Sequence, residues 1–306
     1  MYDVLIIGGG PAGLSAALVL GRACRRVLVL DHGKPRNRWA AYMHGFLSRD
    51  CTPPGEFLRM CREELQGYAN VEFREAEVVG LEGENGSFEI TTRDGGCERG
   101  RKVLLATGVR DHLPPVEGLM ERYGHSVHHC PYCDGWEYRQ KRVAAYGKGA
   151  SVHGLAKTLI GWTHDIVVLT DGPHGMTEEQ HRGLQDLGIG VREERVLRLE
   201  GEGRELRQVV LEGEERLSCE ALFFSLGHEQ CCDLGSRYLG ELTEKGAIGT
   251  NEHKKTYVRG FFAAGDASEE MHLVIIAAGH GATAAVAMNK ELLEEEAAAI
   301  IAARRR

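Results

Sequence analysis

The sequence predicts an α/β protein that consists of two similar domains, and three observations support this fold class. The chain has 306 residues, which corresponds to about two domains at the usual 100 to 200 residues each. A pattern of strand, glycine turn, helix and strand occurs at 3–31 and again at 143–171, about 139 residues later. Glycine fills 40 of the 306 positions, roughly twice its average share, which indicates many tight turns and close backbone contacts.

The first half of the chain opens on a complete β-α-β unit. The apolar run 4–7 predicts a strand, and the glycine turn 8–13 leads into a helix at 14–21. The apolar run 27–30 predicts a second strand, which ends at Asp31. Further strands are predicted where residues alternate or form apolar runs, at 71–79, 88–92 and 102–108.

The second half repeats this order. A strand at 143–146, a glycine turn at 147–152, a helix to about residue 161 and a strand at 166–169 form the second β-α-β unit. Further elements are predicted as strands at 206–211, 221–227 and 260–266, and as a helix that begins near Leu273. From the duplication, we place the crossings between domains near 113–115 and 244–246.

Composition and charge exclude several classes of protein. The formal net charge is 37 − 45 = −8, so no overall basic field attracts nucleic acid or anionic lipid. The apolar stretch 273–288 is short and interrupted by polar residues, so we expect no membrane span. The N-terminus lacks the pattern of a signal peptide, which predicts a cytoplasmic protein. Nine cysteines, an odd number in a chain that can build its own core, argue against a disulfide scaffold.

The first glycine turn carries the pattern Gly8-x-Gly10-x-x-Gly13 between a strand and a helix, and Asp31 ends the next strand. The first glycine permits the tight turn, the second lets a pyrophosphate approach the backbone, and the third lets the helix pack on the strand. The N-terminus of the helix faces the phosphates, and the acid binds a ribose hydroxyl. The pattern in this context predicts a dinucleotide site.

The segment Cys130-Pro131-Tyr132-Cys133 is the second chemical motif. Two residues between the cysteines permit a reversible disulfide and can lower the pKa of one thiol. A zinc half-site is the alternative, because three histidines lie in the same stretch, but there is no second Cys-x-x-Cys pattern in the chain. We predict redox chemistry and no bound metal.

Neighbours of the cysteine pair are candidates for proton transfer. Asp134 can relay a proton to a leaving thiolate, or it is only a turn residue. His129 can stabilise a thiolate and shuttle protons, with a solvent-facing turn residue as the alternative, and the case for His128 is weaker. We expect Trp136 to pack under this loop without chemistry. The adjacent pair Cys231-Cys232 is expected to be two thiols rather than a strained vicinal disulfide.

Together, these motifs resemble the low-molecular-weight thioredoxin reductases. The resemblance rests on the β-α-β opening, Ala106-Thr107-Gly108, the segment from Cys130 to Gly135 before a second β-α-β unit, and Gly265-Asp266, and it covers essentially the whole chain in order. It implies two Rossmann-like three-layer domains, the second inserted in the first. These would be an FAD-binding domain at 1–113 plus 246–306 and a central pyridine-nucleotide-binding-like domain at 114–245. The resemblance further implies a homodimer whose central domain rotates.

The resemblance also implies roles for individual residues. Cys133 would lie beside the flavin, Cys130 would exchange with the substrate disulfide, and Asp134 would act as acid or base. The residues implied in FAD binding come from the first turn, the segment after the second strand, the end of the strand near residue 105 and the segment before the last helix: Gly8, Gly10, Pro11, Ala12, Gly13, Asp31, Asn37, His44, Ala106, Thr107, Gly108, Gly265 and Asp266.

Departures from the family pattern bear on the electron partner. The family usually has a basic cluster for the 2′-phosphate of NADPH after the second fingerprint, but here the strand is followed by Thr170-Asp171-Gly172. An acid at this position repels that phosphate. Lys148 and Val152 in the second turn also weaken its fit to a pyrophosphate. We therefore predict that NADPH is not a normal partner, whereas Asp171 tolerates NADH better.

These departures are similar to a branch that contains the dithiol oxidases of sulfur-bridged natural products, which pass electrons from a dithiol to flavin and on to oxygen. Another similar branch draws its electrons from ferredoxin. We therefore predict an FAD-dependent oxidoreductase that exchanges two electrons with a thioredoxin-like protein or a small-molecule dithiol or disulfide. An NAD(P)H-dependent thioredoxin-disulfide reductase is the alternative, and a non-enzymatic flavin or zinc-binding module is the second alternative.

Overall fold

The computed structural model describes residues 1–232, 234 and 236–305, and these residues fall into two compact units. The first unit contains Met1–Arg38, Gly55–Arg110 and Glu229–Arg306, and the second unit contains Trp39–Pro54 and Asp111–His228. Arg306, the last residue of the predicted FAD-binding domain, lies outside the described residues.

The boundaries of the units differ from those expected from the duplication. The chain crosses between units after 110 and after 228, where β7 (Val109–Asp111) and β16 (His228–Gln230) pair in a two-stranded sheet. Residues 229–245, expected in the central domain, therefore belong to the first unit. Residues 39–54, expected in the outer domain, belong to the second unit. Within it, Gly124 lies so close to this segment that a Cβ there would be 2.4 Å from the backbone of Trp39.

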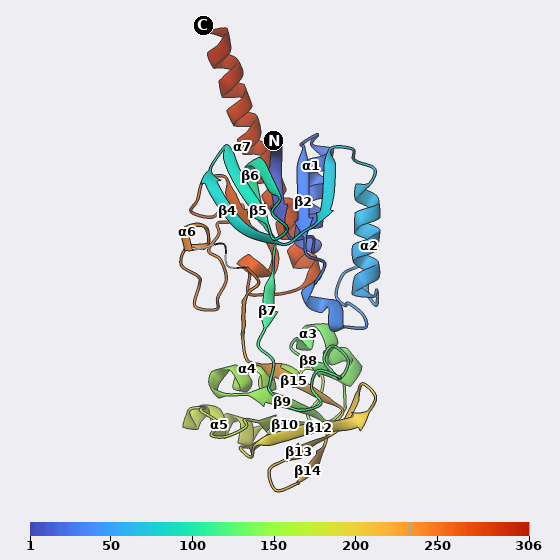
Figure 1. Ribbon diagram of the computed structural model, residues 1–306. Coiled ribbons are helices and arrows are strands. Elements are labelled where there is room, and N and C mark those ends of the chain that lie inside the picture. The colour runs from blue at the N-terminus through green and yellow to red at the C-terminus, as the bar shows by residue number, and fades with distance from the viewer. Residues whose placement is uncertain (233, 235, 306) are drawn as a thin grey trace. The chain divides into compact units, whose positions relative to one another are not determined.

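The first unit is built around a seven-stranded sheet with the order β3-β2-β1-β6-β5-β4, in which β17 also pairs with β6 (Figure 1). Strands β1, β2, β3, β6 and β17 are parallel, whereas β4 and β5 are antiparallel neighbours. The strands are β1 (Tyr2–Ile7), β2 (Val27–Asp31), β3 (Val71–Glu75), β4 (Val78–Glu84), β5 (Ser87–Thr92), β6 (Cys97–Leu105) and β17 (Phe261–Ala263). The helices are α1 (Pro11–Arg22), η1 (Arg36–Trp39), α2 (Pro54–Leu65), α6 (Ser236–Leu239), η3 (Gly265–Ser268) and α7 (Val274–Arg304).

The second unit contains a five-stranded parallel sheet with the order β11-β10-β9-β15-β8 and a three-stranded antiparallel sheet, β12-β13-β14. The strands are β8 (Val127–His128), β9 (Val143–Gly147), β10 (Ile166–Leu169), β11 (Gly190–Arg192), β12 (Val196–Glu202), β13 (Glu205–Leu211), β14 (Arg216–Ser218) and β15 (Ala221–Ser225). The helices are α3 (Pro131–Asp134), η2 (Gly135–Tyr138), α4 (Gly149–Leu159) and α5 (Glu178–Asp186).

Both predicted β-α-β units are present, as β1-α1-β2 and as β9-α4-β10. Their central strands are continuous apolar runs because strands of a parallel sheet are covered on both faces, and 4–7 and 143–147 are indeed buried. The helix predicted near Leu273 is α7, which continues to Arg304 and packs on α1. The α/β fold with two Rossmann-type units is therefore confirmed.

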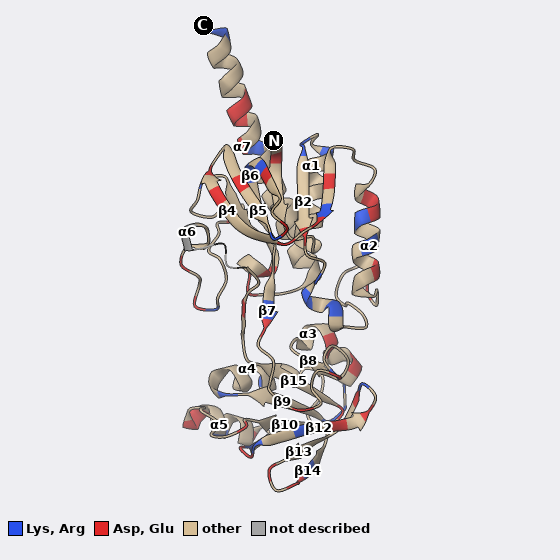
Figure 2. Ribbon diagram, in the orientation of Figure 1, with Lys and Arg blue, Asp and Glu red and all other residues tan. Residues whose placement is uncertain are grey.

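Charged residues of both signs are interspersed along the elements of both units (Figure 2). Among the described residues, no helix is long and apolar enough to cross a membrane, and this includes α7.

Candidate functional site

The first glycine turn, between β1 and α1, has the shape of a dinucleotide cradle. A Cβ at Gly8 would lie 2.2 Å from the carbonyl oxygen of Ala106, and a Cβ at Gly13 would lie 1.9 Å from that of Gly8, so neither position accepts a side chain. By contrast, a Cβ at Gly10 would meet no described atom within 4 Å. Gly10 precedes Pro11, the first residue of α1, so it opens onto space at the N-terminus of the helix. A pyrophosphate binds at such a position.

Residues from the C-terminal part of the chain pack on this turn. Gly265 has a φ of +72°, and a Cβ there would lie 3.0 Å from the Cβ of Ala12. Gly281 of α7 packs on the same residue, since its Cβ would lie 1.9 Å from the Ala12 carbonyl oxygen. Asp266 follows Gly265 and pairs with Arg36 at 2.8 Å. The fold thus places the carboxylate of Asp266 beside the glycine turn.

Asp31 also adjoins the turn, because a Cβ at Gly9 would lie 2.9 Å from the Cβ of Asp31. Its Oδ2 accepts a hydrogen bond from Nη2 of Arg62 at 3.0 Å. Asn37 lies in η1, within the first unit. Residues 106–108 directly follow the end of β6. Of the predicted FAD contacts, only His44 belongs to the second unit.

A histidine that the sequence did not single out adjoins the same place. His280 lies directly before Gly281, and its buried Nδ1 has no hydrogen-bond partner among the described residues. Burial, and then the charge of Lys254, hold the pKa of His280 below its ordinary value. An unpaired buried polar atom costs about 1–3 kcal/mol, and a polar group of a bound cofactor would satisfy it. The open glycine, the two carboxylates and this histidine fit an FAD.

The vicinal cysteines of the first unit are both thiols, as expected. The Sγ of Cys232 lies 3.4 Å from Oγ1 of Thr107. The amide of Cys231 donates to the carbonyl oxygen of Gly108 at 3.2 Å. Both therefore support the segment that follows β6.

In the second unit, Cys130 and Cys133 form a disulfide across α3, with Cα atoms 5.3 Å apart. Pro131 is the first residue of this helix, where its missing N–H costs no hydrogen bond. The turn directs the amide of Cys133 to Sγ of Cys130 at 3.1 Å. When the pair is reduced, this N–H stabilises a thiolate on Cys130.

Asp134, the last residue of α3, pairs with the buried His128. Nδ1 of His128 lies 3.2 Å from Oδ1 of Asp134, and Nε2 lies 3.0 Å from the carbonyl oxygen of His125. Both ring nitrogens therefore lie near oxygen atoms, and these contacts orient the imidazole against the Asp134 carboxylate.

His129, the residue next to His128, lies near a tyrosine hydroxyl and a second carboxylate. Its Nδ1 lies 3.3 Å from the hydroxyl of Tyr123 and 3.9 Å from Oδ2 of Asp111. The Tyr123 hydroxyl donates to the same carboxylate at 3.1 Å. The structure thus pairs Asp134 with His128, for which the sequence made the weaker case. His128 ends strand β8, and the next residue, His129, points to the other side.

Trp136 does not pack under the redox loop, which corrects the expectation from the sequence. Its side chain is 64% exposed, and its ring stacks against the guanidinium of Arg139 at 4.2 Å. Trp162 occupies the expected position instead, since a Cβ at Gly135 would lie 2.9 Å from its ring. Trp162 also packs edge to face with Tyr132. The expectation for Trp136 was wrong because α3 and η2 turn its side chain outward.

The second glycine turn, between β9 and α4, is covered by a loop of its own unit. The amide of Gly149, at the start of α4, donates to the carbonyl oxygen of His174 at 2.8 Å. A Cβ at Gly149 would lie 3.3 Å from the carbonyl oxygen of Gly175. Gly149 is the counterpart of Gly10 in its fingerprint, so the two turns differ in whether the amide of the second glycine is already hydrogen-bonded to a loop of its own unit.

One unit holds an open dinucleotide cradle, and the other holds a Cys-x-x-Cys disulfide next to a buried histidine–carboxylate pair. These features define an FAD-dependent disulfide oxidoreductase. Residues 2–281 match the model of the pyridine nucleotide-disulphide oxidoreductase family, and the chain belongs to this family.

Individual relatives agree with this assignment. The thioredoxin reductase sirT of Leptosphaeria maculans is 30% identical over 307 residues, which cover 94% of each chain. The crystal structure of HlmI has a TM-score of 0.93 and 36% identity, and covers 99% of this chain and 96% of that one. The structure of TrxB from Bacillus anthracis has a TM-score of 0.90 and 32% identity, and covers 97% and 100%.

Several other curated relatives are matched over only about half of their length, for example 44% of the thioredoxin reductase tcpT of Claviceps purpurea, at 39% identity. Taken together, the relatives identify the chain as a thioredoxin-reductase-like flavoenzyme.

Proposed function

We propose that this enzyme exchanges two electrons between FAD, the Cys130–Cys133 pair and an external dithiol or disulfide, without NADPH as a normal partner. The observation that carries this proposal is the hydrogen bond that engages the amide of the second glycine in the second turn. In a working nucleotide site, the amide of the second glycine faces the pyrophosphate. The Gly149 amide is instead bonded to His174 at 2.8 Å, whereas Gly10 is open.

The end of β10 supports the same conclusion. Oδ1 of Asp171 accepts a hydrogen bond from the amide of Val196 at 2.7 Å, and burial together with Asp171 raises the pKa of Tyr146 to about 12. The carboxylate thus holds the start of β12 in place. It offers negative charge where a 2′-phosphate needs positive charge.

The thiol chemistry follows the roles that the family resemblance implies for the two cysteines. In the direction of dithiol oxidation, an external thiolate attacks Sγ of Cys130, and Cys133 leaves as a thiolate. The second thiolate of the external dithiol then attacks the external sulfur that is bonded to Cys130 and releases Cys130 as a thiolate. The external dithiol becomes a disulfide, and the protein pair becomes a dithiol, so atoms and electrons balance. For reduction of a disulfide, the order reverses.

Each residue of the redox loop has a defined task in this sequence. The Cys133 amide, which donates to Cys130 at 3.1 Å, stabilises the Cys130 thiolate. The Asp134–His128 pair supplies and accepts the proton of the departing thiolate. FAD, held by the first unit, would carry the two electrons and return the cysteine pair to its starting oxidation state.

The external partner is a thioredoxin-like protein or a small-molecule dithiol or disulfide, which the names of the thioredoxin reductase relatives support. Oxygen or ferredoxin is the electron partner of the flavin in this proposal. We expect a homodimer, as in the family that the sequence resembles, and light scattering of the purified protein measures this directly.

The test is an anaerobic titration of the yellow protein, followed by its flavin absorbance. We expect NADPH and NADH to leave the flavin oxidised and dithiothreitol to bleach it. Admission of air then separates the two electron partners, since recovery within seconds favours oxygen and slow recovery favours ferredoxin. Bleaching by either nicotinamide at the rate of turnover would make the enzyme a conventional reductase and refute the proposal.

The variant Cys130→Ser is the control for the path of electrons. It removes the sulfur that external thiols attack but leaves the first unit intact, so we expect full flavin content and no bleaching by dithiothreitol. If this variant still bleaches, the dithiol reaches the flavin by a route that bypasses the disulfide.

A further inference from the structure

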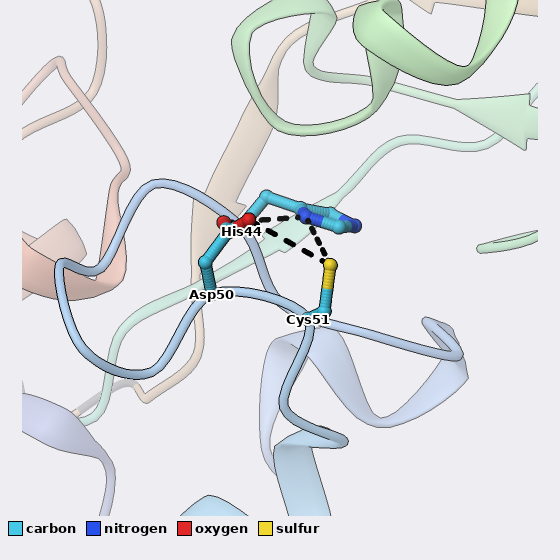
Figure 3. A group of neighbouring side chains, drawn as sticks. All are labelled: His44, Asp50 and Cys51. Carbon is cyan, nitrogen blue, oxygen red and sulfur yellow. Dashed lines mark hydrogen bonds and ion pairs between the residues drawn. The ribbon is translucent and has the colours of Figure 1, made fainter.

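A group of three potential metal ligands lies in segment 39–54 of the second unit. His44, Asp50 and Cys51 converge there, with their ligand atoms all within 4.8 Å of one another (Figure 3). Nδ1 of His44 lies 3.4 Å from Oδ1 of Asp50 and 3.8 Å from Sγ of Cys51. Sγ of Cys51 lies 3.6 Å from Oδ2 of Asp50. Imidazole, carboxylate and thiol are the three side-chain groups that bind zinc.

These separations match the edges of a tetrahedral zinc site. Bond lengths of about 2.0–2.1 Å to nitrogen, 2.0–2.2 Å to oxygen and 2.3 Å to sulfur place neighbouring ligands of a tetrahedron about 3.4–3.6 Å apart. The distances from Nδ1 of His44 to Oδ1 of Asp50 and to Sγ of Cys51 agree with this range or exceed it by a few tenths of an ångström. The distance from Sγ of Cys51 to Asp50 also agrees, but it is measured to the other carboxylate oxygen, Oδ2, so binding through a single oxygen requires the Asp50 carboxylate to turn. We propose that His44, Asp50 and Cys51 bind a divalent zinc-type cation, with a fourth position open to solvent.

Glu137 supplies an independent observation for this assignment. Its Oε1 lies 3.9 Å from Nε2 of His44, the ring nitrogen that does not face Asp50 and Cys51. A histidine that ligates a metal typically donates its other N–H to a carboxylate, which fixes the tautomer and the orientation of the ring. His44 thus has a ligand cluster on one nitrogen and, on the other, a carboxylate at ion-pair distance that would have to move closer to accept a hydrogen bond.

Charge distinguishes a metal site from an activated nucleophile. Asp50 places a carboxylate 3.6 Å from Sγ of Cys51, which disfavours a thiolate without a cation, although Nδ1 of His44 lies 3.8 Å from the same sulfur. Two anionic donors beside an imidazole are stabilised together by a cation. Binding replaces the proton of the Cys51 thiol, which goes to solvent, so the step involves no redox change.

The backbone shows where a test substitution fits. Cys51 has a φ of +59°, a region that glycine adopts without strain and that other residues seldom adopt. The substitution Cys51→Gly therefore removes the thiol while it preserves the loop conformation. Cys97 offers a matched control, because it is another exposed thiol beside a carboxylate, that of Glu89.

The sequence predicted no metal site, because the spacing of these ligands, five residues and then none, fits no familiar zinc motif. The cluster forms only because segment 39–54 folds back on itself, where Met43 bridges to Thr52 and the amide of Gly45 donates to Asp50. Glu137 lies in η2, directly after the redox helix α3. A bound cation would therefore tie segment 39–54 to the redox loop.

The experiment titrates the flavin-bound protein with Co²⁺ alone, without reductant, so that Cys130 and Cys133 remain a disulfide. We expect one Co²⁺ per chain, with visible bands of a tetrahedral thiolate site at wavelengths beyond the flavin absorption, and displacement of Co²⁺ by Zn²⁺. Calorimetry with Zn²⁺ gives the affinity.

Three variants decide the outcome. We expect Cys51→Gly to abolish the Co²⁺ bands, Glu137→Gln to weaken Zn²⁺ affinity by about 10–100-fold, and Cys97→Ser to leave both unchanged. Absence of stoichiometric binding in the wild-type protein, or bands that survive in Cys51→Gly, would overturn the site. An unchanged affinity in Glu137→Gln would overturn the role of Glu137. None of these results depends on the electron partner of the flavin.

Discussion

Two opposing influences set the charge of Asp134. Burial removes water from its carboxyl group and by itself raises the pKa. The charge of His128, its hydrogen bond and the fields of His129 and His44 outweigh this effect, so the pKa of Asp134 lies below its ordinary value of 3.8. The carboxylate is therefore charged at neutral pH, where it can accept a hydrogen bond from His128.

The substitution Asp134→Asn tests this pair. We expect turnover with dithiothreitol to fall about 10²–10⁴-fold, because Asn neither holds the proton of His128 nor exchanges one, while flavin content stays the same. Because the pKa is depressed in the folded state, the stabilisation is present above about pH 5 and is lost as the pH falls below 3.8 toward the lowered value. Urea midpoints of the wild type and the variant should therefore differ at pH 7, and the difference should become smaller as the pH falls below 3.8.

The variant Asp165→Asn is the control, since that carboxylate is exposed and 3.6 Å from Arg142. We expect its urea midpoint to change little at either pH. A difference between wild type and Asp134→Asn that is the same at pH 7 and pH 3 would show that the carboxylate contributes by packing rather than by charge.

At the residue scale, the sequence identified local chemistry but not the choice among neighbours. The disulfide and the glycine cradle were predicted, because both depend on residues within one turn of chain. The choice between His128 and His129, or between Trp136 and Trp162, depends on which side of β8 and α3 faces the interior. That is a property of tertiary packing, which adjacent positions do not reveal.

At the scale of elements, α7 is fastened to β6 by a buried ionic cluster. Lys102 of β6 is fully buried, and its Nζ donates to Glu291 at 2.9 Å, to Glu295 at 2.7 Å and to Asn85 at 2.6 Å. A lysine is rarely buried unless it is paired in this way. The cluster holds the helix that carries Gly281 against the glycine turn.

The substitution Lys102→Met should therefore destabilise the first unit. We expect a loss of about 3 kcal/mol of unfolding free energy, at the lower end for a broken buried pair, because Glu291 keeps Lys255 and Glu295 keeps Arg101. Chemical denaturation monitored by circular dichroism measures the loss.

Arg99→Met on the same strand is the matched control. Arg99 pairs with Glu89 at the surface, where an ion pair contributes about 0–1 kcal/mol. Equal losses of unfolding free energy in the two variants would mean that burial does not strengthen the ion pairs of Lys102.

The elements themselves were largely predictable, and the assignment of segments to units was not. Periodic apolar runs with glycine turns predict strands and helices, because these signals are local. Segment 39–54 has no such pattern, and its membership in the second unit depends on contacts such as that of Trp39 with Gly124. Likewise, the cover of Gly149 by residues 174–175 is visible only in the folded unit.

At the scale of the whole molecule, the cofactor cradle and the redox disulfide belong to different units, each with its own sheet and buried core. Flavin binding at the glycine cradle is therefore expected to stabilise the first unit. A ligand that binds only the folded state stabilises it by about 2.7 kcal/mol at 100 times its Kd.

Calorimetry of the flavin-free protein tests this separation. We expect two transitions, of which excess FAD raises one by on the order of 5–10 °C, as a unit of this size requires for that free energy. In Gly10→Val, the side chain enters the open space at the start of α1, and the φ of −79° at this position suits valine. The variant should thus fold normally, with both transitions in place, and lose the shift with FAD. If both transitions shifted together, the result would show that the two units unfold cooperatively. If Gly10→Val retained the shift, the result would show that the pyrophosphate does not bind at this turn.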